Sequence, residues 1–246
     1  MKLRGHKAII TGSSQGLGKV IAEVMAAEGC EVVVNCAHHA EKAIATAESI
    51  KAAGNQASAY CCDITDAAAV KKMFDDLGNV DILVNNARLN PWLRDKSCPD
   101  DEWFMRVMQV NLLGAYNCSM EFFNRAKERN YGRIVNVSSV RSFMPSEMPN
   151  IAYSVSKSGM HAMTRAFAHN GAPYNILCNT VAPGVIITEN FTKRIPPEKV
   201  QSELAAVPLG RGASCQEVAD AVIFAICNGY VTGETINING GMYYEP

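Results

Sequence analysis

Apolar residues along the chain fall into two alternating patterns, short continuous runs and longer stretches with helical spacing. Residues 8–10 and 31–35 are short runs rich in β-branched side chains, whereas residues 16–29 repeat their apolar positions every three or four residues. Short buried runs predict strands, and the helical period predicts helices that pack against them. By the same criteria, further helices are expected over residues 40–53, 66–76, 100–127 and 152–168, and further strands over 81–84 and 133–137 and in a segment that ends at residue 62.

This alternation predicts an α/β fold with a doubly wound, Rossmann-type parallel sheet and helices on both faces. Right-handed crossovers place successive helices on the surface of such a sheet. The 246 residues, 48% of them hydrophobic, suffice for one sizeable core, so a single domain over 1–246 is expected. Ligands of doubly wound sheets bind beyond the carboxyl ends of the strands. The irregular segments expected to form that cleft are residues 88–99, 139–153 and 184–207.

A glycine-rich turn, residues 11–18, follows the first predicted strand and opens the first predicted helix. Gly12 permits a sharp turn, Gly16 leaves no Cβ between the backbone and a ligand, and Gly18 allows the helix to pack close to the sheet. The N–H groups of the first helical turn would then face an anion. The turn therefore indicates a site for a dinucleotide diphosphate, although an ordinary strand-to-helix connection looks the same when the turn is taken alone.

Charge and composition argue against several classes of function. A formal net charge of -1 without a basic stripe disfavours a nucleic-acid partner. No apolar run approaches the ~20 residues of a membrane span, and the first six residues lack the apolar region of a secretion signal. The nine cysteines are odd in number and have no C-x-x-C spacing, which fits a reducing cytoplasm and disfavours a zinc site. We therefore expect a soluble, cytoplasmic protein without a bound metal or a membrane partner.

Tyr153 and Lys157 are four residues apart at the start of a predicted helix, which places a phenol and an ammonium on one helix face. An ammonium in a partly dry cleft favours the phenolate, so Tyr153 is a candidate for proton transfer near neutral pH. Ser139 follows the predicted strand 133–137 and would lie at the same end of the sheet, where its hydroxyl can bind a carbonyl or alkoxide oxygen. The structural alternatives are chance spacing on a helix face and a turn-capping serine.

These residues belong to a longer series of motifs. In chain order the motifs are the turn at 11–18, Asp63, Asn85-Asn86-Ala87, Asn111, Ser139, Tyr153-x-x-x-Lys157 and residues 179–184, followed by residues 231–235 and 239–241. In their order and spacing the chain resembles the short-chain dehydrogenases/reductases nearly from end to end, and within them the 3-oxoacyl-carrier-protein reductase-like group. The resemblance implies an oxidoreductase that transfers a hydride between NAD(P) and a secondary alcohol or ketone.

The resemblance also implies roles for individual residues. Tyr153 would be the general acid/base, Lys157 would favour its phenolate and hold the nicotinamide ribose, and Ser139 would orient the substrate oxygen. Asn111 would be a proton-relay residue, with a local helix kink as its structural alternative. The implied cofactor contacts, besides Tyr153 and Lys157, are Gly12, Ser14, Gln15, Gly16, Leu17, Cys36, Ala37, His38, Asp63, Ile64, Asn86, Ala87, Pro183, Gly184, Ile186 and Thr188.

Four of the charged residues have two interpretations each. Asp63 would meet the adenine, but it also fits a strand exit next to a helix cap, and the two roles carry equal weight. Arg88 stands where the family usually has glycine. Together with Arg141, two residues after Ser139, it is a candidate to bind a carboxylate, phosphate or sulfonate on the substrate, with Arg94 as a third candidate. The alternative is that these loop arginines are solvated.

The end of the second predicted strand bears on the choice of cofactor. An Asp or Glu there would bind the ribose hydroxyls of NAD(H) and repel the 2′-phosphate of NADP(H). Cys36 occupies this position, and Ala37, His38 and His39 follow without a carboxylate before Glu41. The pattern therefore favours NADP(H) over NAD(H).

Two alternatives to the interpretation as a general oxidoreductase of secondary alcohols and ketones stay open. A 3-oxoacyl-[acyl-carrier-protein] reductase is favoured by the length of residues 196–218 and by the Pro-Leu-Gly-Arg within them, whereas Asn130 and Tyr174 stand where that group often has basic residues. A non-catalytic redox sensor that binds a dinucleotide is disfavoured because all the candidate catalytic residues are present. An anionic or sugar-like substrate is compatible with the arginines.

The family resemblance further implies a homotetramer. Its subunits would meet through the helices around residues 100–127 and 152–170 and through the C-terminal segment. Met160, Met163 and Phe167 repeat at helical spacing and fit either the core or an interface. The expected partners are thus a small-molecule substrate and further copies of the chain.

Overall fold

A parallel sheet of seven strands forms the centre of the computed structural model, which describes residues 1–91, 94–95, 97–188, 191 and 195–244. The strand order is β3-β2-β1-β4-β5-β6-β7, which confirms the doubly wound α/β fold. The strands are β1 (Lys7–Ile10), β2 (Glu31–Cys36), β3 (Ala57–Cys61), β4 (Ile82–Asn85), β5 (Gly132–Val137), β6 (Ile176–Pro183) and β7 (Thr235–Ile238).

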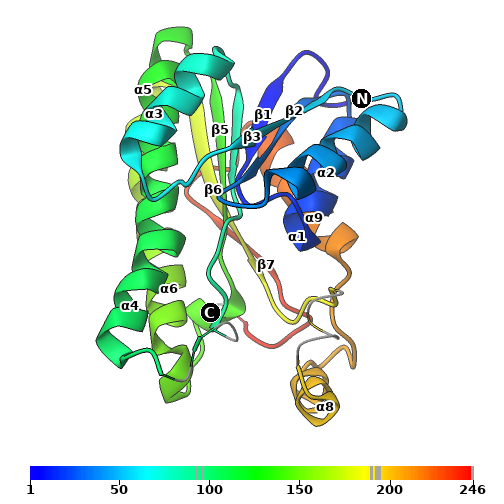
Figure 1. Ribbon diagram of the computed structural model, residues 1–246, viewed down its shortest axis with the longest axis vertical. Coiled ribbons are helices and arrows are strands. Elements are labelled where there is room, and N and C mark those ends of the chain that lie inside the picture. Colours follow the sequence, from blue (N-terminus) through cyan, green and yellow to red (C-terminus); the bar gives the residue numbers. More distant parts are fainter. Residues whose placement is uncertain (92–93, 96, 189–190, 192–194, 245–246) are drawn as a thin grey trace.

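Helices cover both faces of this sheet (Figure 1). One face carries α1 (Gly16–Ala27), α2 (Ala40–Ala52) and α9 (Cys215–Cys227), and the other carries α3 (Ala67–Leu77), α5 (Gly114–Arg129) and α6 (Ile151–Gly171). The helix expected over 100–127 is α4 (Asp100–Met108) and α5, joined by a π-helical stretch at Gln109–Leu113. α8 (Pro197–Ala205) lies beyond the sheet, at the bottom of the view. Within the described ranges, none of the helices combines the length and the apolar character that a bilayer crossing requires.

Alternate residues of the central strands pack into two separate cores. Ile10 and Val34 belong to the core beneath α1, α2 and α9, whereas Ile9 and Val33 belong to the core beneath α3, α5 and α6. All four side chains are fully buried. The central strands are therefore apolar on both faces, which explains the continuous β-branched runs of the sequence.

Buried polar side chains gather near the carboxyl ends of β4, β5 and β6. Asn85 Nδ2 donates to Asn136 Oδ1 (2.8 Å), Asn136 Nδ2 donates to Thr164 Oγ1 (2.8 Å), and the Thr164 hydroxyl lies 2.7 Å from that of Thr180. Such bonds are strong in a low-dielectric interior. They fix α6 against the strands, and α6 carries the candidate catalytic pair.

The strand order reverses between β1 and β4, because the chain runs outward from β1 to β3 and then returns to the other side of β1. The carboxyl ends of β1 and β4 are therefore adjacent, and Thr11 N donates to Val84 O across them (3.0 Å). Ligands of doubly wound sheets bind at such a switch point.

Candidate active site

The glycine-rich turn between β1 and α1 leaves room for close approach of a ligand. Gly12 has a φ of +62°, and a Cβ there would lie 2.8 Å from Ala87 Cα, so a side chain would displace the backbone. A Cβ on Gly18 would lie 2.6 Å from Gly12 O, whereas one on Gly16 would meet no described protein atom within 4 Å. The space beside Gly16 is therefore open to a bound group.

The N-terminus of α1 adjoins this space. Its N-cap residue Gln15 makes no capping hydrogen bond through its side chain, and its first turn contains no acidic residue. The unpaired N–H groups and the helix dipole therefore favour an anion. Together with the open space beside Gly16, this arrangement fits the diphosphate of a dinucleotide.

Hydrogen bonds join the turn after β4 to the glycine turn. Thr11 Oγ1 accepts from the N–H groups of Asn86 and Ala87 (both 3.0 Å). Asn86 Nδ2 donates to the carbonyl oxygens of Thr11 (2.9 Å) and Gly12 (3.1 Å). Because Thr11 and Asn86 are buried, water does not compete for these bonds. The two turns therefore form one rigid unit.

A cavity of about 550 Å³ lies at the switch point. Most of the predicted cofactor contacts line it: Gly12, Ser14, Gln15, Gly16, Leu17, Cys36, Ala37, His38, Asp63, Ile64, Asn86, Ala87, Tyr153, Gly184, Ile186 and Thr188. Pro183 and Lys157 are buried outside the lining. The segments expected to form the cleft contribute residues 88–91, 139–141, 150, 153, 184–186, 188, 191, 195 and 203, while their residues 92–93, 96, 189–190 and 192–194 lie outside the described residues.

Two polar residues organise the β2 and β3 end of the cavity. Asp63 Oδ1 accepts from the N–H and the hydroxyl of Thr65 (both 2.9 Å), which is a structural role at the exit of the strand. Asp63 also lines the cavity, so the same residue can contact a cofactor there. Asn35 Oδ1 accepts from Gly12 N (3.3 Å), and its Nδ2 donates to Cys62 O (3.1 Å). Asn35 was not among the residues predicted from the sequence, although a polar residue directly after three valines was an available signal.

Tyr153 lines the cavity, and Lys157 is buried with 1% of its surface exposed. Lys157 Nζ donates to Val137 O (2.8 Å) and lies 3.4 Å from Met160 Sδ. The same nitrogen is 5.8 Å from the centre of the Tyr153 ring. Burial, with a smaller contribution from the positive charge of Arg88, lowers the pKa of Lys157 from 10.5 to about 7. The amine next to the phenol therefore changes charge near neutral pH.

Ser139 follows β5 and lines the same cavity as Tyr153. Its Oγ accepts from the N–H of Arg141 (3.2 Å) and so caps the short 3-10 turn after the strand. This bond uses an acceptor site of the hydroxyl and leaves its hydrogen for donation to a bound oxygen. Ser139 can therefore cap the turn and also orient a substrate oxygen, the two roles expected from the sequence.

Asn111 lies in the π-helical stretch and is fully buried, outside the cavity lining. Its Oδ1 accepts from Leu89 N (2.6 Å), and its Nδ2 donates to Ser156 Oγ (3.1 Å). The Ser156 hydroxyl in turn donates to Tyr153 O (2.7 Å). Single π turns inside α-helices are frequent at functional sites. Asn111 thus connects the segment after β4 to the start of α6.

The three candidate arginines have different surroundings. Arg141 Nη2 lies 3.0 and 2.9 Å from the two carboxylate oxygens of Glu203 on α8, and both side chains line the cavity. Arg94 forms an ion pair with Asp100. Arg88 is exposed, lines the cavity, and has no hydrogen-bond or ion-pair partner among the described residues.

His161 on α6 connects the loop after β5 to β7. Its Nε2 lies 2.8 Å from Ser138 Oγ and 2.9 Å from Ser142 Oγ, and its Nδ1 lies 3.1 Å from Thr235 Oγ1. Both serine hydroxyls donate to backbone carbonyl oxygens, so Nε2 carries the hydrogen and Nδ1 accepts. Burial is the main cause that lowers the pKa of His161 to about 4. This neutral connection was not predicted, and a histidine on a largely apolar helix was its only signal in the sequence.

The family model of the short chain dehydrogenases matches residues 6–199, more than half of the chain. The chain belongs to the short-chain dehydrogenase family. A 3-oxoacyl-[acyl-carrier-protein] reductase of Aquifex aeolicus is 36% identical to this short-chain dehydrogenase over 99% of each chain. Two solved structures also resemble it. A 3-oxoacyl-[acyl-carrier protein] reductase of Brucella melitensis with bound NAD has 29% identity and a TM-score of 0.89, covering 98% of this chain and 92% of its own. A gluconate 5-dehydrogenase of Burkholderia cenocepacia J2315 in complex with NADP and tartrate has 29% identity and a TM-score of 0.86, covering 98% and 96%.

This short-chain dehydrogenase is therefore an oxidoreductase of CH–OH or keto groups that uses NAD(P), and it is similar to the 3-oxoacyl-carrier-protein reductase group. The solved relatives contain NAD in one case and NADP in the other. The choice between the two cofactors thus depends on the residues of this chain.

Proposed function

We propose that the protein interconverts a ketone and a secondary alcohol with Tyr153 as the proton-transferring residue. The observation that carries the proposal is that Tyr153, Ser139 and the glycine turn line one cavity, with the Lys157 amine 5.8 Å from the phenol ring. The nicotinamide cofactor, when bound, supplies or accepts the hydride.

Side chains of the protein transfer the proton and stabilise the group that loses it. In the direction of reduction, the Tyr153 hydroxyl gives its proton to the substrate oxygen, while the Ser139 hydroxyl donates a hydrogen bond to the same oxygen. The charged form of Lys157 stabilises the phenolate that remains. Val137 O holds that amine in place at 2.8 Å. In the direction of oxidation the same groups act in reverse.

Tyr153→Phe tests this assignment because it removes the hydroxyl and keeps the ring. We expect kcat to fall by a factor of about 100 or more, while the Kd for the cofactor changes by less than about two-fold. Tyr230→Phe is the matched control, since Tyr230 is 98% exposed. A Tyr153→Phe enzyme within a few-fold of wild type would remove Tyr153 from the mechanism. Wild-type protein that binds NAD(P)H but turns over no carbonyl in a broad panel would favour the redox sensor.

We propose a small polar or anionic carbonyl compound, such as a keto sugar acid, as the substrate class. Arg141 and Glu203 line the same cavity as Ser139, so the cleft offers a cation and a carboxylate. A substrate carboxylate can replace Glu203 at Arg141, and substrate hydroxyls can donate to Glu203. The gluconate 5-dehydrogenase structure, which contains tartrate, supports this class.

The second candidate is reduction of a 3-oxoacyl group on acyl carrier protein. It is favoured by the 36% identity to the Aquifex aeolicus reductase over nearly the whole chain. Initial rates with keto sugar acids and with 3-oxoacyl thioesters would separate the two, since kcat/KM should be at least tenfold higher for the true class.

We propose NADP(H) as the preferred cofactor. Cys36, Ala37 and His38 line the cavity after β2, and they contribute no carboxylate that would repel a 2′-phosphate. The next carboxylate along the chain, Glu41, lies 3.3 Å from the His39 ring. Fluorescence titration with both reduced cofactors measures the preference. A Kd for NADH at least tenfold below that for NADPH would reverse it.

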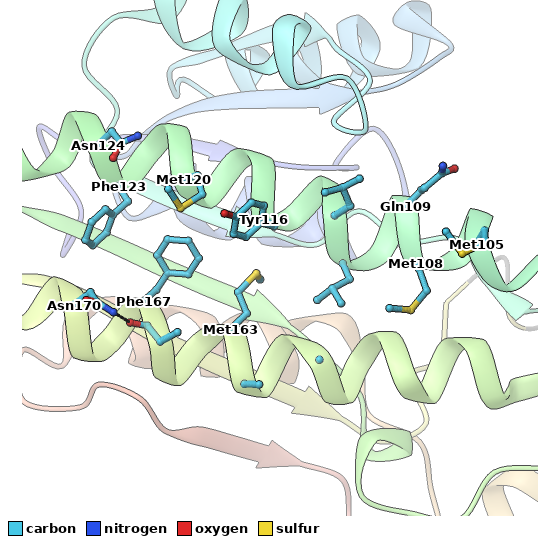
Figure 2. A pocket seen from close by; sticks show the side chains of 15 residues that line it. Met105, Met108, Gln109, Tyr116, Met120, Phe123, Asn124, Met163, Phe167 and Asn170 are labelled. Atoms are coloured by element: carbon cyan, nitrogen blue, oxygen red, sulfur yellow. Dashed lines mark hydrogen bonds between the residues drawn. The ribbon is translucent and has the colours of Figure 1, made fainter.

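We propose a homotetramer whose contacts include an apolar groove of about 810 Å³ between α4, α5 and α6 (Figure 2). Tyr116, Met120 and Met163 face one another across it from α5 and α6. Met105 and Tyr116 are 55% and 46% exposed, and large exposed apolar patches commonly mark interfaces. A second copy would cover them. Light scattering at micromolar concentration should give four times the 26.6 kDa chain mass, and a monomeric mass would refute the proposal.

We also propose a cytoplasmic location. All nine cysteines are free thiols, and disulfides are rare in reducing compartments. Fractionation of cells that produce the protein would test this, and recovery outside the cytoplasm would contradict it.

A further inference from the structure

The backbone at Arg88 lies next to the glycine turn. The residue before it, Ala87, lies so close to Gly12 that an added Cβ there would approach Ala87 Cα to 2.8 Å. Ala87 N also donates to Thr11 Oγ1 (3.0 Å). The backbone that carries Arg88 is therefore part of the rigid unit that fits the diphosphate.

The Arg88 charge contributes to the pKa of two groups, one on α6 and one on α9. It contributes to the lowered pKa of Lys157 on α6. It also offsets part of the burial that raises the pKa of Cys215, the first residue of α9, and α9 packs against α1. Arg88 itself is exposed and is among the cavity-lining residues, together with Gly12, Gly16 and Tyr153.

The glycine turn itself lacks a full positive charge. Residues 11–18 contain no lysine or arginine, and Lys19 lies 3.7 Å from Glu23 on the exposed side of α1. The helix N-terminus supplies only about half an elementary charge, whereas a dinucleotide diphosphate carries two negative charges. Of the two arginines that line the cavity in the described part of the chain, Arg141 is already paired with Glu203, and Arg88 is unpaired.

We propose that the Arg88 guanidinium binds the diphosphate of the cofactor and supplies the positive charge that the glycine turn lacks. The proposal rests on the use of NAD(P) described above and reassigns Arg88 from the substrate to the cofactor. The planar guanidinium of Arg88 can donate two parallel hydrogen bonds to phosphate oxygens. The bound diphosphate then neutralises Arg88, which removes a repulsion on Lys157 and helps to keep that amine charged during catalysis.

The test compares Arg88→Ala and Arg88→Lys with wild type in direct binding. NADH and NADPH are titrated by fluorescence, and ADP-ribose, which has the diphosphate but no nicotinamide, is titrated by calorimetry. We expect Arg88→Ala to raise all three Kd values by about 10- to 100-fold, because a charged hydrogen bond is lost. Arg88→Lys should recover part of the loss, since it keeps the charge without the planar guanidinium. The dependence of Kd on salt should also weaken in Arg88→Ala.

Arg106→Ala is the matched control, because Arg106 lies on α4 with 56% of its side chain exposed, and its Kd values should stay within two-fold of wild type. An unchanged Kd for ADP-ribose with a raised KM for an anionic substrate would overturn the proposal and return Arg88 to the substrate. A loss confined to NADPH would overturn it in favour of a contact with the 2′-phosphate. Wild-type protein that binds no dinucleotide would refute the use of NAD(P) before any substitution is made, and the proposal with it.

Discussion

On the cofactor side of the cleft, the turns after β1, β2 and β4 are joined by hydrogen bonds among buried groups, whereas on the substrate side the loop after β5 meets α8 through a partly exposed ion pair. Thr11, Asn35 and Asn86 make the first set of contacts. Arg141 and Glu203 make the second, with 31% and 17% of their side chains exposed.

This difference separates a preformed site from an adjustable one. Buried bonds to backbone groups are costly to break because each partner would be left unsatisfied. A partly exposed ion pair contributes little to stability, so α8 can move away from the loop at small cost. We therefore expect the cofactor side to keep its shape when a ligand binds, and the substrate side to adjust more easily.

Gly12→Ala should break the cofactor side and have the largest effect on stability. The new Cβ would lie 2.8 Å from Ala87 Cα at a φ of +62°, so both strain and a backbone clash are added. Gly54→Ala is the matched control, with a φ of +83° and no described atom within 4 Å of the new Cβ. We expect Gly54→Ala to cost about 1–2 kcal/mol, and Gly12→Ala about 1–3 kcal/mol more. Urea unfolding measures both, and equal losses would show that the contact with Ala87 is not tight.

Lys157→Met should stabilise the protein without bound cofactor while it removes activity. The unfolded lysine keeps its proton up to its ordinary pKa of 10.5, but the native one loses it near 7. The cost of the buried charge is therefore present in full below pH 7 and is relieved as the pH rises from 7 to 10.5. At pH 6 we expect a gain of about 1–4 kcal/mol in the free energy of unfolding.

The same variant should also lack the rise in stability between pH 7 and 10.5 that the lowered pKa of Lys157 predicts for wild type. Thermal unfolding across this range, relative to wild type, checks the sign. A loss of stability at pH 6 would mean that the contacts of the amine outweigh its burial.

Arg141→Ala and Glu203→Gln should have the smallest effect on stability and act on the substrate side. We expect each to change the free energy of unfolding by less than about 1 kcal/mol, because the pair is partly exposed. Each should raise KM for the substrate, and the double variant should be no worse than the poorer single one if the two residues act as a pair. Additive losses in KM would show that Arg141 and Glu203 bind the substrate independently.

The sequence predicted the features that depend on short-range pattern. Strand and helix order follows from hydrophobic periodicity, so the α/β sheet was predicted correctly. The turn at 11–18 and the spacing of Tyr153 and Lys157 are also local patterns. Tyr153 and much of the turn line one cavity, and the Lys157 amine lies outside the lining, 5.8 Å from the centre of the Tyr153 ring. Contacts between distant segments were not predicted. Glu203 lies 62 residues after Arg141, and no local rule pairs them.

The hydrophobic pattern also did not predict local departures from α-helical geometry. Asn111 was noted as a poor helix former. The π-helical stretch around it, however, depends on Leu89 and Ser156, which come from distant segments and form hydrogen bonds with its buried side-chain amide. The partners of His161 come from three separate segments, so only the assembled fold shows that its ring is neutral and buried.

The π turn at Gln109–Leu113 sets the rotation of α5 relative to α4 around their common helix axis. Met108, Leu112, Tyr116 and Met120 all line the apolar groove at steps of four residues. In a uniform α-helix each such step advances about 40° around the axis, so the stripe would drift by about 120° over this distance. The wider turn takes up the excess residue and returns the stripe to the groove. An α-helical turn with the same number of residues would instead rotate everything after it by about 100°, which would move Asn117 away from Ile64 O, its acceptor at 3.0 Å. The rotation of α5 relative to α4 thus depends on this π turn, and its conversion to an α-turn without loss of a residue would disturb the site and the groove together.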